Sequence, residues 1–186
     1  KVVVVEDLNS RKTEELPYDK VILATGARPR MPKVPGIEPE GITTLQSMQD
    51  ADFLRKIADE KKIKKAVVIG GGLIGIETCE ALHLAGIEIT VVEMLPQLLS
   101  FLDMEIAKLV ENHVRSKGAN VMSNNGLEAF LGKDGKLTGI KLQNGAELEC
   151  QLAIIAIGVI PNSDLAGRIG LEVGPTDGIV VDKHMQ

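Results

Sequence analysis

The chain has 186 residues and a formal net charge of −5 at pH 7, with 44% hydrophobic and 25% charged residues. These proportions are typical of a globular core, and the length suits one ordinary domain or one domain with parts of another. The acidic charge excludes a general attraction for nucleic acid or for an anionic membrane surface. No apolar segment reaches the roughly twenty residues that span a bilayer. Because no signal peptide is recognised either, we expect a cytoplasmic protein with no membrane or nucleic-acid partner.

The first part of the chain is predicted to contain two short strands, Val2 to Val5 and Val21 to Ala24, with the turn-prone pair Asn9-Ser10 between them. Residues 28–41 are rich in proline, which excludes a helix or the interior of a sheet. This segment is therefore predicted to be a semi-rigid crossing between two structural units. A helix is predicted after it, because Ser47 and Asp50 have the spacing of a capping box.

The most informative motif begins where the apolar run Ala66 to Ile69 leads directly into Gly70-x-Gly72-x-x-Gly75. A strand, a glycine turn and a helix in this order are typical of a dinucleotide site. The first glycine permits a sharp turn, the second lets the backbone approach a pyrophosphate, and the third lets the helix pack close to the strand. The unpaired N–H groups of the first helical turn form an anion site. Gly86 is predicted to end this helix.

An acidic residue, Glu93, ends the next apolar run, Ile87 to Val92, at the position expected for a ribose-binding acid. Its carboxylate can accept hydrogen bonds from both ribose hydroxyls, and it would repel a 2′-phosphate. The following residue is Met94, so no neighbouring cation is available to hold that phosphate. The pattern therefore predicts NAD(H) as the coenzyme in preference to NADP(H).

The rest of the chain changes from helical to strand patterns. An amphipathic helix is predicted from about Asp103 to Lys117, ended by Gly118. The residues expected to share its buried face are Ile106, Leu109, Val110, His113 and Val114. Residues 125–157 are predicted to form an antiparallel ribbon of about three strands that ends in the apolar run 152–157, because Asp-Gly and Asn-Gly turn signals divide them. A last strand is predicted at Ile179 to Val181.

Neither cysteine has the spacing of a redox pair or of a metal site. Cys79 and Cys150 are far apart in sequence, and both are predicted to be buried structural residues. The three histidines have no predicted nucleophile or base as partner, so none is assigned to catalysis.

Three segments together give the chain a resemblance to the class I pyridine nucleotide-disulfide oxidoreductases, within the branch of NADH oxidases, coenzyme A disulfide reductases and rubredoxin reductases. One is the run Tyr18-Asp-Lys-Val-Ile-Leu-Ala-Thr-Gly-Ala-Arg-Pro29, which is similar to that family's Ala-Thr-Gly strand and exit turn. Another is the glycine motif with Glu77 and Glu93. The third is Ala153-Ile-Ile-Ala-Ile-Gly-Val-Ile-Pro-Asn162, which resembles the return segment into the flavin domain.

The resemblance implies an α/β fold with three layers. We expect a Rossmann-like NAD-binding domain with a parallel central sheet and an antiparallel ribbon, flanked by strands left from an FAD domain. The implied divisions are residues 1–40 as the end of the first FAD-domain segment, 41–157 as the NAD(H)-binding domain, and 158–186 as the return into the FAD domain. Because no second glycine motif, redox cysteine or flavin-binding Gly-Asp motif is recognised, we expect a fragment that binds no FAD alone.

The same resemblance implies how the intact flavoenzyme works. NADH would place its pyrophosphate on the glycine turn and its nicotinamide near a flavin, which accepts hydride. The implied cofactor-binding residues are Thr25, Gly26, Gly70, Gly72, Leu73, Ile74, Gly75, Glu77, Glu93 and Gly158. No catalytic residue and no metal ligand is implied within this chain. The implied partners are NADH and the rest of the FAD domain, and a homodimer of the intact protein stays open.

Other functions stay open at this point. A self-sufficient NAD-dependent dehydrogenase would need a substrate domain and a positioned acid or base, and the residues after Val121 supply neither. A methyltransferase that binds its cosubstrate through a ribose-binding acid would fit Gly75 and the long ribbon poorly. A non-catalytic module that senses NAD is not distinguished by the sequence.

Overall fold

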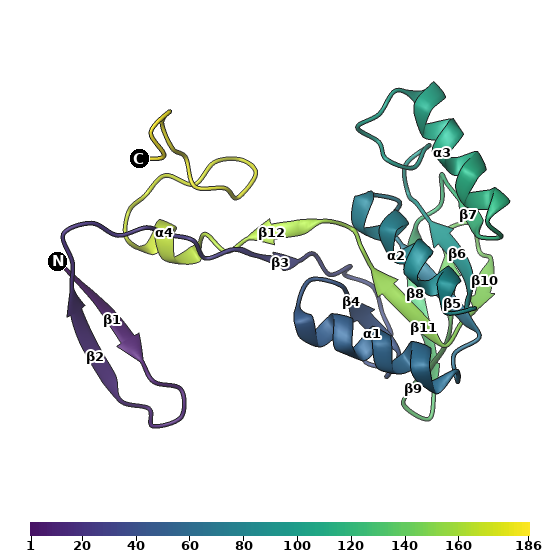
Figure 1. Cartoon of the computed structure of the whole chain (residues 1–186), viewed down its shortest axis with the longest axis horizontal. Coiled ribbons are helices and arrows are strands. Elements are labelled where there is room, and N and C mark those ends of the chain that lie inside the picture. Colours follow the sequence, from purple (N-terminus) through teal and green to yellow (C-terminus); the bar gives the residue numbers. More distant parts are fainter. The chain divides into compact units, whose positions relative to one another are not determined.

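The computed structural model describes all residues, 1–186, and the chain divides into two compact units (Figure 1). One unit combines residues 1–27 with 161–186, and the other contains residues 28–160. The expected assignment of the flanking residues to an FAD domain, with boundaries at residues 40 and 157, stays a prediction.

The unit 28–160 is built around a five-stranded sheet in the order β4-β11-β5-β6-β7, in which every neighbouring pair is parallel. Its strands are β4 (Ile42–Thr44), β5 (Lys65–Ile69), β6 (Glu88–Val92), β7 (Asn120–Met122) and β11 (Leu152–Ile155). Residues on β5 and β11 alternate between the two faces of the sheet, and both faces are covered. This burial on both sides explains why the two strands are continuous apolar runs.

Three helices cover one face of this sheet. They are α1 (Met48–Glu60), α2 (Leu73–Leu84) and α3 (Met104–Ser116). Val68 of β5 and Ile154 of β11 are fully buried in the cluster that includes Leu82 of α2 and Val114 of α3. None of the helices has the length and apolar character needed to cross a lipid bilayer.

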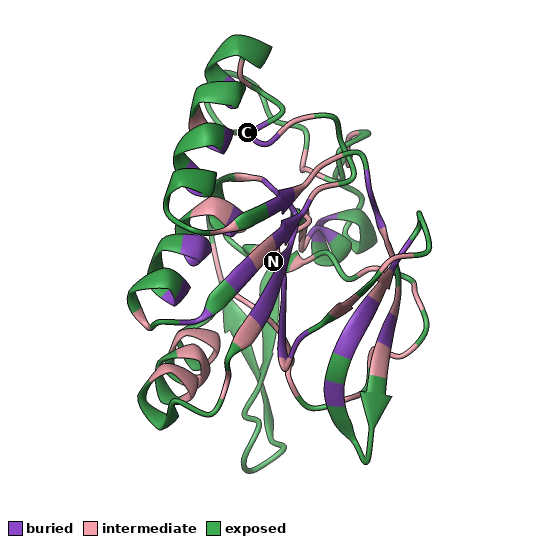
Figure 2. Ribbon diagram, turned by 90° about the vertical axis from the view of Figure 1, so that its right-hand side faces the viewer, coloured by how far each residue is buried: buried purple, intermediate pink, exposed green.

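An antiparallel sheet in the order β10-β9-β8 covers the other face. Its strands are β8 (Leu127–Lys133), β9 (Lys136–Leu142) and β10 (Glu147–Glu149). Val67 and Ile155 of the parallel sheet pack in one buried cluster with Phe130 and Ile140 of the antiparallel sheet. Figure 2 shows the buried residues concentrated in the central strands. The unit therefore has three layers, and the predicted α/β fold with a parallel sheet and an antiparallel ribbon is confirmed.

The predicted helix ends are also confirmed. At the start of α1, the Ser47 hydroxyl accepts the N–H of Asp50 at 3.1 Å, and the Asp50 carboxylate accepts the N–H of Ser47 at 3.0 Å. Gly86 and Gly118 follow the ends of α2 and α3 with positive φ angles of 75° and 93°. Glycine adopts this left-handed conformation without the steric cost that a Cβ brings.

The predicted buried face of α3 is partly wrong. Val114 is buried as expected, but Ile106, Leu109 and His113 are exposed, and the other buried positions are Ala107 and Glu111. Glu111 can be buried because its carboxylate is ion-paired: the Oε1 atom accepts from Lys108 Nζ at 3.0 Å and from Arg115 Nε at 2.9 Å. Apolar periodicity alone does not reveal a carboxylate satisfied in this way.

The predicted end of the ribbon is also corrected. Instead of belonging to the antiparallel sheet, the run that begins at Leu152 forms β11, which lies between β4 and β5 and is parallel to both. All four residues of this strand are buried, which is the reason for its unbroken apolar sequence.

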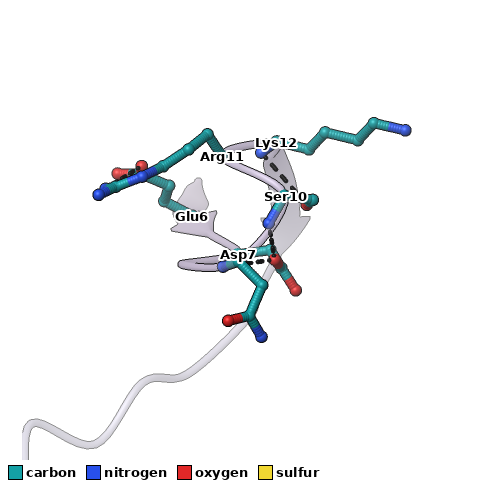
Figure 3. Close-up of polar contacts among 6 residues, drawn as sticks. Glu6, Asp7, Ser10, Arg11 and Lys12 are labelled. Carbon is teal, nitrogen blue, oxygen red and sulfur yellow. Dashed lines mark hydrogen bonds and ion pairs between the residues drawn. The ribbon is translucent and has the colours of Figure 1, made fainter.

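The other unit contains a hairpin of β1 (Val2–Glu6) and β2 (Thr13–Pro17) and the short helix α4 (Asp164–Arg168). The predicted turn at Asn9-Ser10 is confirmed (Figure 3). There the Asp7 Oδ1 atom accepts the N–H groups of Asn9 at 3.0 Å and Ser10 at 2.6 Å. The hydrogen bond from the Ser10 N–H is the main reason that the pKa of Asp7 lies below its usual value.

Two predicted strands are absent from this unit. Val21 to Ala24 form no strand, and Ile179 to Val181 contribute only an isolated bridge between Val173 and Ile179. Val21 to Ala24 have no neighbouring strand to pair with, and Ile22 is 89% exposed. The pairing at Ile179 is confined to one bridge and does not extend into a ladder. Apolar residues favour a strand, but a strand is stable only where a neighbouring strand accepts and donates its backbone hydrogen bonds.

Two paired segments connect the units, β3 (Ala27–Pro29) and β12 (Val159–Pro161). Within the first unit, Thr25 Oγ1 donates to the main-chain oxygen of Asn162 at 2.6 Å. Asn162 Nδ2 in turn donates to the main-chain oxygen of Thr25 at 3.0 Å. The predicted crossing at residues 28–41 begins within β3. After β3 it contains no helix and no strand, and only an isolated bridge at Glu40.

Candidate functional site

A cavity of about 460 Å³ opens at the carboxyl ends of β5, β6 and β11, wholly within the unit 28–160. Its main walls come from residues 70–72, 93–95, 125–127 and 156–158. In sheets of parallel strands, ligands bind at this edge.

The glycine turn between β5 and α2 is tightly enclosed at two positions and open at a third. A Cβ at Gly70, where φ is +109°, would collide with the main-chain oxygen of Ala156, and a Cβ at Gly75 would collide with that of Gly70. A Cβ at Gly72 would have no heavy atom within 4 Å. The turn therefore needs glycine at Gly70 and Gly75 for its own packing, whereas the space at Gly72 is free for a ligand.

The N-terminus of α2 is arranged to accept an anion. Its N-cap residue is Gly72, so no side chain is hydrogen-bonded to the amides of the first turn. These amides have no partner within the helix, and the helix dipole places a partial positive charge there. A backbone cradle with open space beside it fits the pyrophosphate of a dinucleotide.

The carboxylate of Glu93 is fixed at the end of β6 by two backbone amides. Its Oε2 atom accepts the N–H of Gly71 at 2.6 Å, and its Oε1 atom accepts the N–H of Leu95 at 2.7 Å. Each carboxylate oxygen keeps further acceptor capacity. The acid is therefore held in one orientation beside the glycine turn, as a pair of ribose hydroxyls would require.

The loop after Glu93 folds over the glycine turn. Leu99 donates its N–H to the main-chain oxygen of Gly71 at 2.8 Å, and the fully buried side chain of Leu98 lies against Gly71. Leu99 itself has a positive φ angle of 47°, an uncommon conformation for a leucine. The loop thus helps to fix both the turn and the carboxylate.

The predicted site residues fall into four groups. Four of them line the cavity or its turn together: Gly70, Gly72, Glu93 and Gly158. Gly75 packs beneath the turn. The side chains of Leu73, Ile74 and Glu77 project from the start of α2 as exposed groups outside this cavity, with Leu73 58% exposed and Ile74 41% exposed. Thr25 and Gly26 belong to the other unit, where Asn162 hydrogen-bonds to both.

Several residues that line the cavity were not predicted. Arg30 comes from the proline-rich crossing. Asn125 and Gly126 lie in the segment after β7, the edge strand of the parallel sheet. Asn125 is only 6% exposed. A polar residue shortly after a sheet strand was an available signal, because Asn125 comes three residues after the end of β7 and the carboxyl ends of parallel strands meet at one edge.

The two cysteines are free and buried, as predicted. Burial raises the pKa of the Cys79 thiol to about 11 and that of the Cys150 thiol to about 12. A thiol with such a pKa is protonated at neutral pH and is therefore a poor nucleophile. No group of three or more histidine, cysteine or acidic side chains is placed to hold a metal ion.

Comparison with known proteins gives a match over the whole chain. Residues 1–186 match the family described as pyridine nucleotide-disulphide oxidoreductase. An NADH oxidase of Methanocaldococcus jannaschii is 35% identical over 173 residues, which cover 92% of this chain and 38% of that protein. The structure of reduced CoADR-RHD from Bacillus anthracis is 36% identical with a TM-score of 0.93, over 100% of this chain and 33% of that one.

A third protein was solved with its coenzyme. The water-forming NADH oxidase from Lactobacillus brevis bound to NADH is 29% identical with a TM-score of 0.90, over 100% of this chain and 40% of that one. An engineered form, bound to NADPH, carries exchanges that include glycine to alanine, aspartate to alanine and, at the next position, alanine to arginine. The chain thus spans less than half the length of each of these three proteins.

Proposed function

The chain belongs to the pyridine nucleotide-disulphide oxidoreductase family, and we propose that it is the NADH-binding part of an FAD-dependent member. Its role is to hold NADH so that hydride passes to a flavin held by the rest of the intact protein. Flavin supplies the hydride acceptor, and the residues of this chain supply binding and orientation.

The observation that carries this proposal is the pairing of an open glycine turn with a fixed carboxylate in one cavity. The amides at Gly72 and the first turn of α2 are free to bind the pyrophosphate. The Glu93 carboxylate is placed beside them for the adenosine ribose. The pyrophosphate and the adenosine ribose are the two polar parts of a dinucleotide that these two kinds of group bind.

A preference for NADH over NADPH is part of the proposal. A 2′-phosphate would meet the negative charge of Glu93, and the next residue, Met94, offers no cation. In the oxidase engineered to bind NADPH, the exchanged glycine and aspartate are as many positions apart as Gly75 and Glu93. We therefore match Glu93 to that aspartate and Met94 to the residue replaced by arginine.

The remaining predicted residues are proposed to act at the nicotinamide end. Leu73, Ile74 and Glu77 are exposed at the start of α2, where an extended nicotinamide would leave the pyrophosphate cradle. Gly158, with a φ angle of +96° and no atom within 4 Å of a Cβ position, leaves room for the coenzyme to pass. Thr25 and Gly26 are proposed to contact FAD in the intact protein.

The unit 1–27 with 161–186 supports the idea of a larger flavin domain. All five residues of β1 and all five of β2 are exposed, including a run of four valines. A two-stranded hairpin without a buried face is marginally stable alone. We propose that the rest of the FAD domain covers this hairpin.

Titration of the chain with NADH tests the proposal. We expect a dissociation constant between micromolar and millimolar, NADPH binding at least ~10-fold weaker because an opposing charge meets the phosphate, and no electron transfer from NADH to a dye. Saturation by NADPH at equal or lower concentration would contradict the coenzyme preference. Stoichiometric FAD in the purified chain would contradict the assignment of the flavin site to another part of the protein.

A further inference from the structure

Asn125 is a buried amide in the cavity wall, next to the proposed ribose-binding acid. Its N–H donates to the main-chain oxygen of Glu93 at 3.1 Å, and its side chain is 6% exposed. Glu93 therefore contacts Gly71 through its carboxylate and Asn125 through its main-chain oxygen. If the adenosine ribose is held at the Glu93 carboxylate, the base attached to that ribose lies in the part of the cavity that Asn125 lines.

The orientation of the Asn125 amide is determined by a backbone donor. The N–H of Asn144 donates to Asn125 Oδ1 at 3.3 Å. An N–H group requires an oxygen at that position, so the nitrogen of the amide must point the other way. Asn144 lies in the turn after β9, and the main-chain oxygen of Gly126 accepts the N–H of Gln143 at 2.9 Å. These contacts hold the amide in place.

The Nδ2 amino group of Asn125 has no hydrogen-bond partner within the protein. Because no fully enclosed side-chain nitrogen or oxygen is left without a partner, this amino group must be accessible to solvent, and Asn125 is one of the residues that line the cavity. A buried residue that satisfies its oxygen internally and turns its donor to a binding cavity is suited to recognise an acceptor on a ligand.

The chemistry of adenine fits this donor. The edge of adenine that is farthest from the glycosidic bond carries ring nitrogen N1 and the 6-amino group. This edge would meet the wall that Asn125 lines if the base extends into the cavity from a ribose held at Glu93. N1 is an acceptor with a lone pair in the ring plane. In nucleic-acid recognition the amide of asparagine reads the N6 and N7 edge of adenine with both of its polar atoms; here the oxygen is held by Asn144, so only the amino group is available, for a single hydrogen bond to N1. Apolar neighbours in the cavity, Leu95 and Leu127, can contact the faces of the ring.

We propose that Asn125 recognises the adenine of the coenzyme, with its Nδ2 group donating a hydrogen bond to ring nitrogen N1. This inference rests on the proposed NADH site and adds the residue that selects the base. Asn125 thus determines which base the site accepts. It affects the affinity for the coenzyme and takes no part in hydride transfer from the nicotinamide.

The test compares NADH with reduced nicotinamide hypoxanthine dinucleotide in the same binding titration. The two ligands have the same charge and the same ribose and phosphate groups. Hypoxanthine carries a 6-oxo group and a proton on N1, so a donor from the protein meets a donor on the ligand. We expect the wild-type chain to bind NADH ~10-fold more tightly, in line with the effect of one base-reading amide.

The variant Asn125→Asp sharpens the comparison. Aspartate keeps an oxygen for the N–H of Asn144 but replaces the Nδ2 donor by a second acceptor, which suits the protonated N1 of hypoxanthine. We expect the affinity ratio of the two ligands to fall by ~10-fold or more, to about one or below. The added negative charge lowers the affinity for both ligands by the same factor, so this effect cancels in the ratio of the two affinities.

A matched control is Asn144→Asp. It makes the same chemical change in the adjacent turn, keeps the backbone N–H that holds Asn125, and retains an oxygen for its own contact with the N–H of Ala146 at 3.0 Å. The ratio should equal that of the wild type.

Three results have distinct meanings. A wild-type chain that binds the two dinucleotides equally well overturns the inference, and this measurement needs no variant to fold. An unchanged ratio in Asn125→Asp overturns it too, since a purely structural Asn125 would act on both ligands alike. Failure of the wild type to bind either ligand would instead reject the NADH site itself.

Discussion

At the scale of single residues, the three glycines of the turn have different surroundings, in keeping with the separate role that the sequence predicts for each. Gly70 and Gly75 are each pressed against a main-chain oxygen, whereas Gly72 faces open space. A fourth glycine, Gly71, was not singled out by the motif, yet its N–H holds the Glu93 carboxylate at 2.6 Å. The site is thus built by backbone groups before any ligand binds, which lowers the ordering cost of binding.

Replacing Gly72 by alanine separates binding from folding. The φ and ψ angles of Gly72, −78° and −174°, are accessible to alanine, so we expect the free energy of unfolding to change by no more than ~1 kcal/mol. The new methyl group would occupy the space beside the first-turn amides, so NADH affinity should fall by ~10-fold or more, because the phosphate contacts are lost. Urea unfolding and NADH titration measure the two effects.

The matched variant is Gly71→Ala. Its methyl group would overlap Leu98 and approach the Glu93 Oε2 atom to 3.2 Å, so we expect a loss of ~1–3 kcal/mol in the free energy of unfolding from overpacking as well as weaker NADH binding. Wild-type NADH affinity in Gly72→Ala would show that the coenzyme does not use this turn.

At the scale of elements, the sequence predicted those parts whose cause is local. The capping box of α1, the glycine after α2 and the turn at Asn9-Ser10 each depend on residues within a few positions of one another. The position of β11 in the parallel sheet and the absence of a strand at Val21 to Ala24 depend on distant pairing partners, which no local pattern contains. Asn125 was missed because the short strand before it, β7, was not predicted, so its place at the carboxyl edge of the sheet was not recognised.

The capping box of α1 predicts a pH dependence of stability. Burial raises the pKa of Asp50, but hydrogen bonds from the N–H groups of Gln46 and Ser47 and from two hydroxyl groups outweigh it, and the pKa lies below its ordinary value of 3.8. A carboxyl group whose pKa is lowered by folding stabilises the fold at any pH above the pKa that it has in the unfolded chain. This stabilisation is lost as the pH falls through the pKa of the folded state.

We therefore expect Asp50→Asn to be ~1 kcal/mol less stable than the wild type at pH 7, with the difference shrinking as the pH falls below about 4. Urea unfolding of both proteins at several pH values measures it. Asp52→Asn, an exposed change on the same helix, serves as the control. A difference that stays constant down to pH 2–3 would exclude an ionised Asp50 as the cap.

The ion pairs of Glu111 predict how α3 is attached to the sheet. Arg115 both pairs with Glu111 and donates from Nη2 to the main-chain oxygen of Val121, the middle residue of β7, at 2.7 Å. Glu111→Gln weakens this network, and because its cationic partners are partly exposed we expect a loss of only ~1–2 kcal/mol in the free energy of unfolding. Glu105→Gln, exposed at the start of the same helix, should change it by less than ~0.5 kcal/mol. Urea unfolding measures both changes. An equal change in the free energy of unfolding for the two variants would show that the ion pairs of Glu111 do not stabilise the fold.

At the scale of the whole molecule, the two units differ in what holds them together. Every member of both buried hydrophobic clusters lies between residues 34 and 157, and every residue that lines the cavity lies between residues 30 and 158. The unit 1–27 with 161–186 has a single buried hydrophobic residue, Ala166, and an exposed hairpin. The buried core and the proposed coenzyme site thus lie in one unit, and the proposed contact with flavin lies in the other.

A shortened protein of residues 28–160 tests this division. It keeps the whole three-layer core, so we expect a cooperative unfolding transition and an NADH dissociation constant within ~3-fold of that of the full chain, since no lining residue is removed and such a factor is below 1 kcal/mol. Hydrogen exchange on the full chain should agree, with slow exchange in β5, β6 and β11 and fast exchange in β1 and β2, whose amides lack a covering layer. If the shortened protein unfolded or lost NADH binding by a much larger factor, the flanking residues would contribute to the coenzyme site directly, and the assignment of binding to residues 28–160 would be wrong.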